Sequence, residues 1–206
     1  MLHIMTQKIH PCSVRLLPAF AALVVGPVPL IIPALAQPAT VPPPIEQLGA
    51  DCARPQYVSD TLVCADTALR ALDADVARLS RTPPALAGDA LWEPQAAWMR
   101  RRSLCAFRTD QSACLAAAYA DRRAVLMAGA APGTRPLRCD GPWRGRDLLA
   151  SIANAGQAMT IIENGAVLAV ATPQAKDWQP WLAWRKSGGR IILQPQAGAV
   201  TRCRLS

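Results

Sequence analysis

The side chains that could do chemistry in this 206-residue chain are mainly cysteines, because histidine is nearly absent. Both histidines, His3 and His10, lie within the first 36 residues, together with Cys12. An even set of cysteines behind an export leader is typical of a disulfide framework. The lack of histidine removes the usual basis of acid–base, triad and zinc chemistry. We therefore expect a disulfide-stapled binding protein, not an enzyme, without metal or cofactor. Its remaining cysteines are Cys52, Cys64, Cys105, Cys114, Cys139 and Cys203.

The first 36 residues have the pattern of a secretory signal peptide. Lys8 and Arg15 precede an apolar stretch over residues 16–35, and a small-x-small cleavage site ends at Ala36. The alternative is a retained membrane anchor, but prolines interrupt the stretch and no positive flank follows it. The pattern predicts cleavage near Ala36 and a periplasmic or secreted protein.

The charge of the chain is unevenly distributed. Residues 37–130 contain 10 basic and 10 acidic side chains, whereas residues 131–206 contain 10 basic and 4 acidic ones. This excess indicates either a mildly basic solvated surface or an anionic partner at the cell envelope, such as a lipid headgroup or an acidic polymer. A nucleic-acid partner is not expected for an exported chain.

Proline and glycine divide the remaining chain into three parts. Residues 37–50 are proline-rich and predict an extended linker. A break at residues 129–136 separates an Ala/Leu/Arg-rich half from a half with alternating strands. We expect a helical domain over residues 51–130 and a β domain over residues 131–206.

The first half shows helical periodicity. Ser59 is the expected N-cap of a first helix that ends at Pro83–Pro84. A second helix is expected from about residue 89 to 107 and a third over residues 114–127. The core-facing stripe of the first helix is formed by Leu62, Leu69, Leu72, Val76 and Leu79.

The positions of four cysteines favour one pairing in this half. Cys64 opens the first expected helix and Cys105 closes the second, so antiparallel packing would bring them together. Cys52 and Cys114 flank the same end. We favour Cys64–Cys105 with Cys52–Cys114, although four cysteines allow three connectivities. Each disulfide would stabilise the bundle by about 2–4 kcal/mol.

The second half predicts short strands and two hairpins. Asn164-Gly165 separates residues 158–163 from 166–171, and Ser187–Gly189 separates residues 181–186 from 190–194. Outer strands are expected at residues 138–143, 148–153 and 200–205, with a Cys139–Cys203 disulfide between the first and last. The expected fold is therefore α+β: a disulfide-stapled small helical hairpin or bundle followed by a small antiparallel β-barrel.

The spacing of polar and aromatic residues around the first four cysteines resembles the LprI-type lysozyme-inhibitor N-terminal domain over about residues 52–128. One departure is Asp60, where that family usually has Glu. The resemblance implies an exported helical domain, and some members of the family protect bacteria from host lysozyme. The motif residues are Asp66, Leu72, Asp73, Gln95, Trp98, Arg102, Tyr119 and Arg122.

The last 70 or so residues are similar to an MliC-type domain, the β-barrel inhibitor of c-type lysozyme. Cys139, the Asn-Gly hairpin, residues 182–188 and Cys203 carry the similarity. The inhibitory loop of that family has an SGxxY-type motif, whereas residues 174–178 here read QAKDW. We therefore expect the helical half to contribute more to inhibition than the barrel.

Several tryptophans and arginines could have either a structural role or a role in binding a partner. Trp98 is expected in the core, and Arg102 and Arg122 are expected to pair with Asp66 or Asp73. In a strand, Trp178 and Trp184 would share one face and Trp181 the other, with at least one exposed. The residues that we expect to contact a sugar or protein partner are Lys176, Trp178, Trp181, Arg185 and Lys186.

Three functions remain open at this point. The first is a binder or inhibitor of lysozyme-like muramidases, with c-type lysozyme as a candidate partner. The second is an envelope interaction protein whose basic C-terminal domain binds anionic glycan or lipid. The third is a cryptic hydrolase: a distant carboxylate pair could act as a glycosidase site, but nothing points to one, since Glu46, Glu93 and Glu163 are widely separated.

Overall fold

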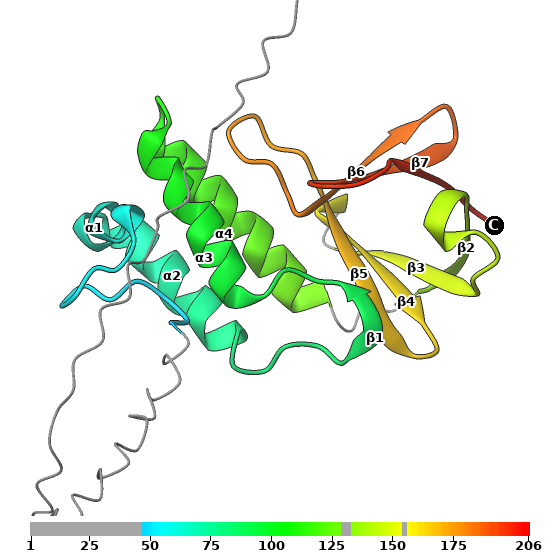
Figure 1. The fold of residues 1–206 in the computed structure, drawn as a ribbon, viewed down its shortest axis with the longest axis horizontal. Coiled ribbons are helices and arrows are strands. Elements are labelled where there is room, and N and C mark those ends of the chain that lie inside the picture. The colour runs from blue at the N-terminus through cyan, green and yellow to red at the C-terminus, as the bar shows by residue number, and fades with distance from the viewer. Residues whose placement is uncertain (1–46, 129–132, 154–155) are drawn as a thin grey trace, which may run out of the picture. The chain divides into compact units, whose positions relative to one another are not determined.

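The computed structural model describes residues 47–128, 133–153 and 156–206. The expected leader and most of the expected linker lie outside this range, as does the expected domain boundary at residue 130. The described residues form an α+β fold in which helices precede most of the strands (Figure 1). The helices are α1 (Val58–Ala65), α2 (Thr67–Leu79), α3 (Gln95–Ser103) and α4 (Gln111–Met127).

The first expected helix is divided into α1 and α2 at Asp66. The Asp66 carboxylate accepts hydrogen bonds from the backbone N–H groups of Ala68 and Leu69, at 2.8 and 3.1 Å, and so acts as the N-cap of α2. The expected cap at Ser59 is wrong, because α1 begins one residue earlier and Tyr57 is its N-cap. The chain therefore turns in the middle of the predicted stripe.

The expected helix over residues 89–107 is wrong in its first part. Residues Leu86–Leu91 form strand β1, α3 begins directly after Pro94, and a short 3-10 helix covers Leu104–Phe107. Proline lacks an N–H and is tolerated only where a helix begins. The preceding residues pair with β5 instead, where the N–H of Val167 donates to the carbonyl of Ala85 at 2.9 Å. Tertiary pairing thus overrides the local pattern.

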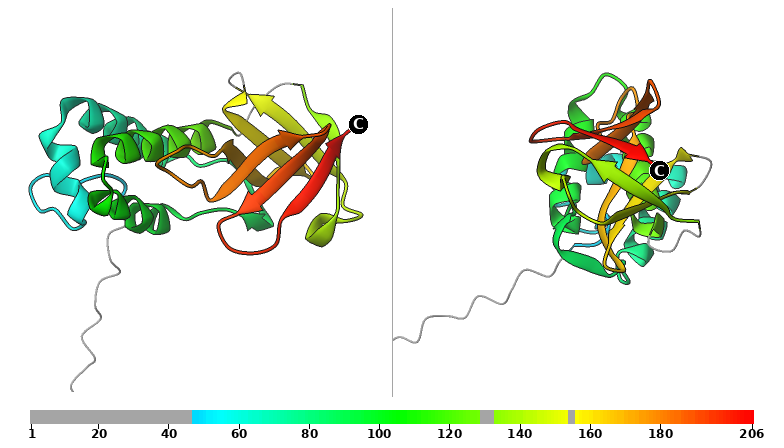
Figure 2. Two further views of the ribbon diagram at one scale, coloured as in Figure 1. Left: turned by 90° about the horizontal axis from the view of Figure 1, so that it is seen from above. Right: turned by 90° about the vertical axis from the view of Figure 1, so that its right-hand side faces the viewer.

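Seven strands close into a barrel, and β1 is an additional strand beside β5 (Figure 2). The expectation of a wholly antiparallel barrel is wrong, because β5 and β6 pair in parallel, with Thr172 opposite Ala183 and Pro173 opposite Trp184. A connection over residues 174–181 joins these two strands. The barrel strands are β2 (Arg135–Cys139), β3 (Leu148–Ala153), β4 (Ala158–Glu163), β5 (Ala166–Pro173), β6 (Leu182–Ser187), β7 (Arg190–Pro195) and β8 (Thr201–Leu205).

Both predicted hairpins are confirmed. Asn164 and Gly165 have φ angles of 50° and 80°, the left-handed pair that a two-residue hairpin turn requires. The second hairpin joins β6 to β7, with Ser187 opposite Arg190. The expected strand over residues 138–143 is too long, since the chain leaves β2 after Cys139 and forms a 3-10 turn at Gly141–Trp143.

Three disulfides join cysteines that are consecutive beyond residue 36. The predicted Cys139–Cys203 disulfide is confirmed, and no disulfide joins the two halves in the described residues. The favoured pairing in the helical half is wrong, because the structure has Cys52–Cys64 and Cys105–Cys114. The turn at Asp66 makes α1 a separate helix, so Cys64 lies at its end, where Cys52 reaches it.

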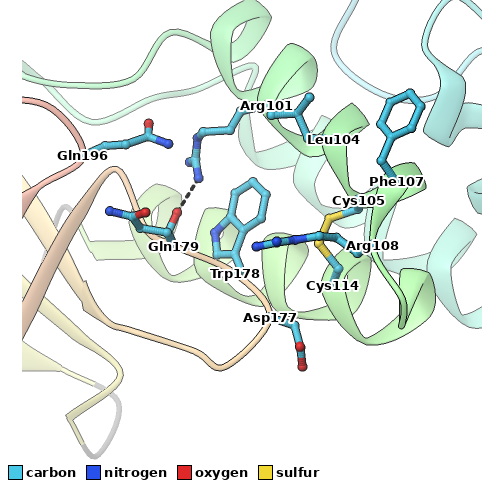
Figure 3. A pocket seen from close by; sticks show the side chains of 10 residues that line it. All are labelled: Arg101, Leu104, Cys105, Phe107, Arg108, Cys114, Asp177, Trp178, Gln179 and Gln196. Carbon is cyan, nitrogen blue, oxygen red and sulfur yellow. Dashed lines mark hydrogen bonds between the residues drawn. A yellow bond between two sulfur atoms is a disulfide. The ribbon is translucent and has the colours of Figure 1, made fainter.

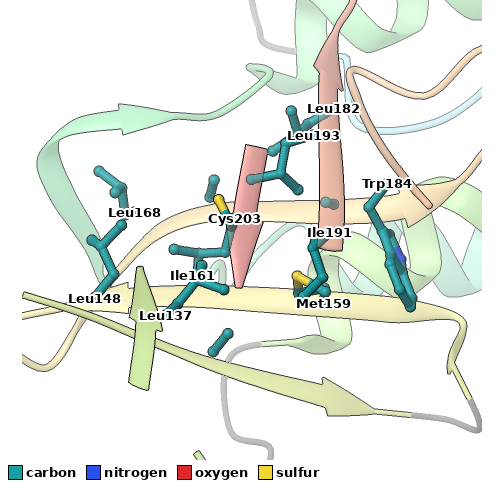
Figure 4. Close-up of a cluster of buried hydrophobic side chains, with 13 residues drawn as sticks. Leu137, Leu148, Met159, Ile161, Leu168, Leu182, Trp184, Ile191, Leu193 and Cys203 are labelled. Atoms are coloured by element: carbon teal, nitrogen blue, oxygen red, sulfur yellow. The ribbon is translucent and has the colours of Figure 1, made fainter. Parts of the chain in front are cut away.

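Each half has its own apolar core. The barrel interior is filled by aliphatic side chains together with Trp184 and Cys203 (Figure 4). The helical core contains Trp98, Leu115 and Tyr119, and it also receives Trp178 from the connection between β5 and β6. The two halves therefore meet at two places: β1, which precedes α3 in the chain, pairs with the barrel strand β5, and Trp178 packs into the helical core.

Candidate functional site

A buried ionic network joins the four helices through one residue from each. The Arg102 guanidinium of α3 donates to the carboxylates of Asp60 and Asp73 and to the hydroxyl of Tyr119. Tyr119 in turn donates to Asp73, with 2.7 Å between the oxygens. Burial raises the pKa of Tyr119 well above its ordinary value, which keeps the hydroxyl proton in place as a donor.

The same two carboxylates hold the chain that precedes α1. Asp60 accepts from the N–H groups of Gln56 and Tyr57, both at 3.1 Å. Asp73 accepts from the N–H of Ala50 at 2.9 Å. A Cβ atom at Gly49 would lie 2.6 Å from a carboxylate oxygen of Asp73, so only glycine fits there without displacement. The network thus anchors the N-terminal segment on α2.

A second buried arginine links α4 to the start of α3. Arg122 donates to the Gln95 side chain and to the Glu93 carbonyl, both at 2.9 Å. Gln95 in turn donates to the carbonyl of Leu48 at 2.8 Å. Trp98 is fully buried, as expected. The motif residues therefore act as a structural framework: Arg102 pairs with Asp73 as predicted, whereas Asp66 is a helix cap.

An exposed turn follows this framework at residues 104–108. The Cys105–Cys114 disulfide fixes the turn to α4, and the N–H of Arg108 donates to the carbonyl of Cys105 at 3.1 Å. The Gln111 side chain donates to the Ala106 carbonyl at 2.6 Å. Despite this support, Leu104 is 59% exposed and Phe107 is 73% exposed. The 104–108 turn is thus a rigid element that displays apolar side chains.

An open groove of about 390 Å³ lies between this turn and the barrel connections (Figure 3). One wall is formed by Leu104, Phe107, Arg108 and the Cys105–Cys114 disulfide. The other wall comes from the connection between β5 and β6, through Asp177, Trp178 and Gln179, and from Gln196 after β7. The groove therefore brings apolar and charged side chains together beside a turn that is held by a disulfide.

Arg101 connects the two walls. Its guanidinium lies 4.0 Å from the centre of the Trp178 ring and donates to the carbonyl of Gln179 at 2.6 Å. The same group forms a two-pronged ion pair with Glu93, with N–O distances of 2.8 and 2.5 Å. Because Glu93 neutralises it, Arg101 positions the connection and is not a free charge for a ligand.

Asp121 of α4 holds the other side of that connection. It accepts from the Trp178 indole N–H at 2.8 Å and from the hydroxyl of Thr172 in β5. Burial raises the pKa of the Asp121 carboxyl, and the hydrogen bonds from Thr172 and Trp178 partly oppose this effect. Helix and barrel are therefore joined through a carboxyl group that is sensitive to pH.

The structure does not bring the five expected partner-binding residues together as one site. Trp178 is only 5% exposed and belongs to the helical core. Trp181 is half-buried and Trp184 is in the barrel core, so the expectation of an exposed tryptophan among these three is wrong. Lys176, Arg185 and Lys186 are exposed. The connection turns inward at Trp178 because Asp121 and Arg101 provide its polar partners.

The sequence reasoning missed the 104–108 turn. Arg100, Leu104 and Phe107 follow at spacings of four and three residues and are exposed, whereas Trp98, Met99 and Arg102 are buried. These exposed basic and apolar residues on α3 and the 3-10 helix that follows it were the available signal.

The fold and these surfaces define a disulfide-stapled α+β protein. In the described residues, no group of three or more His, Cys, Asp or Glu side chains is placed to hold a metal ion. No helix of the described part is long and apolar enough to cross a membrane. The disulfides indicate an oxidising, extracellular-type compartment. Comparisons with family models, curated proteins and solved structures give no match.

Proposed function

We propose that this protein is an exported inhibitor of a muramidase, either c-type lysozyme or another enzyme of that class. The observation that carries the proposal is Phe107, a largely exposed aromatic side chain on a turn fixed by a disulfide. Large aromatic side chains on rigid, projecting turns are typical anchors for an enzyme cleft. The turn with Arg100 is the proposed contact surface.

Rigidity favours binding by this turn. A loop that is ordered before binding loses little conformational entropy in the complex. The disulfide, the Gln111 side chain and the backbone hydrogen bond of Arg108 all restrict it. Phe107 can therefore enter a cleft without a preceding ordering step.

The charges beside Phe107 suit the chemistry of a glycosidase cleft. Arg100 and Arg108 are exposed, and no described carboxylate forms an ion pair with either. Glycosidases place a pair of carboxylates beside the scissile bond. Arginine forks match carboxylates, so this end of the protein complements such a cleft locally.

The sequence supports the same assignment. The spacing in residues 52–128 resembles LprI-type inhibitors, and the leader over residues 1–36 predicts export to the periplasm or exterior. The helical half has as many basic as acidic residues, so it meets less long-range repulsion from a basic lysozyme than the barrel does. The QAKDW stretch of residues 174–178 lacks the inhibitory motif of MliC-type barrels.

A turnover assay with the oxidised protein tests the proposal. Phe107→Ala should raise the inhibition constant against a susceptible muramidase about tenfold or more, because it removes the anchor. Leu149→Ala, which removes another exposed apolar side chain on β3, is the matched control and should leave the constant unchanged. Equal inhibition by wild type and Phe107→Ala, or no inhibition of c-type lysozyme and of a second muramidase, would contradict it.

A further inference from the structure

The outer surface of β2, β7 and β8 carries a concentrated group of arginines, which we call the arginine face. Its members are Arg138, Arg144, Arg190, Arg202 and Arg204, all exposed. They surround a hollow of about 340 Å³ that is also lined by Cys139, Asp140 and Cys203. This surface is distinct from the 104–108 turn.

Strand register explains why the arginines gather there. Leu137, Ile191 and Cys203 point into the barrel and are buried. Their neighbours in sequence therefore point outward. Arg138 of β2 lies directly opposite Arg204 of β8, and the pairing of Ile191 with Cys203 puts Arg190 next to Arg204. Three guanidinium groups thus form a row across three strands.

Acidic partners are scarce on this face. Asp140 uses one carboxylate oxygen to accept from the Arg202 backbone N–H at 2.8 Å. Arg138 approaches Asp147 at 3.7 Å, but both side chains are largely exposed. Within the described residues, Arg144, Arg190, Arg202 and Arg204 have no ion pair. By contrast, Arg146 on another side of the barrel pairs with both Asp89 and Glu163.

This arrangement is unfavourable for the isolated protein. Like charges directly opposite each other on neighbouring strands destabilise a sheet. An anion bound across the row would reverse the sign of that interaction. Residues at cross-strand positions have Cβ atoms about 5 Å apart, so two forks can reach a single phosphate group. A phosphate group within a chain has two non-bridging oxygens set tetrahedrally about phosphorus, so two forks can each approach one of them, whereas a bidentate fork occupies both oxygens of a planar carboxylate.

A membrane surface fits less well than a polymer. The exposed large apolar side chains of the described residues are Val58, Leu86, Leu104, Phe107, Met127, Leu149 and Ile152, and none of them lines the hollow. Stable attachment to lipid combines charge with buried apolar area. A hollow lined by arginines instead accommodates a chain that presents one charged group after another.

We propose that the arginine face binds a linear anionic polymer whose repeating charges are phosphate groups. The binding goes beyond the proposed inhibition and does not depend on it. An inhibitor that is held on such a polymer would remain at the envelope. The interaction is electrostatic, so its affinity falls as the salt concentration rises.

The test uses the full oxidised protein and labelled long-chain polyphosphate as the probe. The variant R138Q/R190Q/R204Q removes the row, and R54Q/R70Q/R81Q removes three exposed charges from the helical half as a control of equal net charge. At low salt we expect the dissociation constant to rise about tenfold or more for the first variant and to change much less for the second. The slope of log affinity against log salt should fall by about 2, since each phosphate contact contributes ~0.7.

Several outcomes would overturn the inference. Equal weakening by the two triple variants would mean that only net charge matters, and no weakening by either would remove the site. Binding to phosphatidylglycerol vesicles without binding to polyphosphate would assign the face to a membrane. Equal affinity for poly-glutamate would refute the preference for phosphate.

Two measurements separate this site from the proposed inhibitory surface and from misfolding. The R138Q/R190Q/R204Q variant should inhibit a muramidase as well as wild type does. Its far-UV circular dichroism and its free-thiol content should match those of the wild type. If the triple variant does not fold, the single variants R190Q and R204Q replace it, each with a smaller but measurable rise in the dissociation constant. Wild-type affinity in both would overturn the inference.

Discussion

The helical half and the barrel use arginine in opposite ways. In the helices, Arg102 and Arg122 are buried and engage side chains and carbonyls from several elements. In the barrel, the interior cluster is apolar and the arginines lie on the outside. Among the described residues, the fully buried arginines are therefore confined to the helical half.

This difference shows what holds each half together. The short helices pack around an apolar core and are also joined by a polar network whose members meet in only one arrangement. A closed barrel is specified by its apolar interior and strand pairing, so its outer face can change without loss of the fold. The helical half should accordingly be sensitive to the loss of a buried arginine, whereas the barrel should tolerate the loss of an exposed one.

The largest expected effect comes from Arg102→Met. This change leaves Asp60 and Asp73 buried without their cation, and breaking a buried ionic group in this way costs about 3–5 kcal/mol. Urea unfolding of the oxidised protein measures the loss. Arg204→Met, at an exposed position of the barrel, should change the free energy of unfolding by less than about 0.5 kcal/mol. Similar losses of stability for both variants would contradict this difference between the helical half and the barrel.

The stability lost on removal of a disulfide should increase with the length of chain that the disulfide closes. Replacing Cys139 and Cys203 by alanine opens a loop with a sequence separation of 64, and replacing Cys105 and Cys114 opens one of 9. The chain-entropy relation gives losses of about 4 and about 2.5 kcal/mol. Denaturant unfolding of the two variants compares these losses.

The replacement of Cys105 and Cys114 should nevertheless weaken muramidase inhibition more than the replacement of Cys139 and Cys203, because it loosens the 104–108 turn. Weaker inhibition by the variant without Cys139 and Cys203 would contradict that role of the turn.

The smallest effects concern pH, and two carboxyl groups should respond in opposite directions. Burial raises the pKa of Asp121, so its contribution to stability is present at low pH and is lost as the pH rises through the folded-state pKa. The hydrogen bonds from Arg146 lower the pKa of Glu163, so its contribution is present above the unfolded-state pKa and is lost as the pH falls through the lower folded-state value.

Unfolding free energies across pH distinguish these two cases. The destabilisation by Asp121→Asn should be greatest near pH 4 and should shrink toward pH 7. The destabilisation by Glu163→Gln should be greatest near pH 7 and should disappear toward pH 3. Parallel pH profiles of the two variants would contradict the opposite pKa shifts of Asp121, which joins the helices to the barrel, and Glu163, which pairs with Arg146 on the barrel.

Features set by local geometry were predictable from the sequence. The Asn164-Gly165 turn has one favoured backbone shape, and this shape determined the strands on both sides. The Cys139–Cys203 disulfide followed because the two cysteines lie in the first and last barrel strands. The helical core stripe through Leu69 and Val76 followed from periodicity.

Features set by distant partners were not predictable in this way. Leu86–Leu91 is a strand because β5 provides a free edge about 80 residues later in the chain. Trp178 is buried because Asp121 and Arg101, from two different helices, supply its hydrogen-bond and ring partners. The wrong disulfide pairing came from Asp66, which is equally compatible with a helix interior and a helix cap until its neighbours are placed.

The consecutive pairing of cysteines also determines how the protein can mature. Beyond residue 36, the first cysteine joins the second, the third joins the fourth, and the fifth joins the sixth. A chain that enters an oxidising compartment from its N-terminal end presents each thiol just before its native partner. Incorrect pairs must be corrected by thiol–disulfide exchange, which is slow without a catalyst. If the thiols oxidise in the order in which they enter such a compartment, the native set forms directly and no isomerase is required.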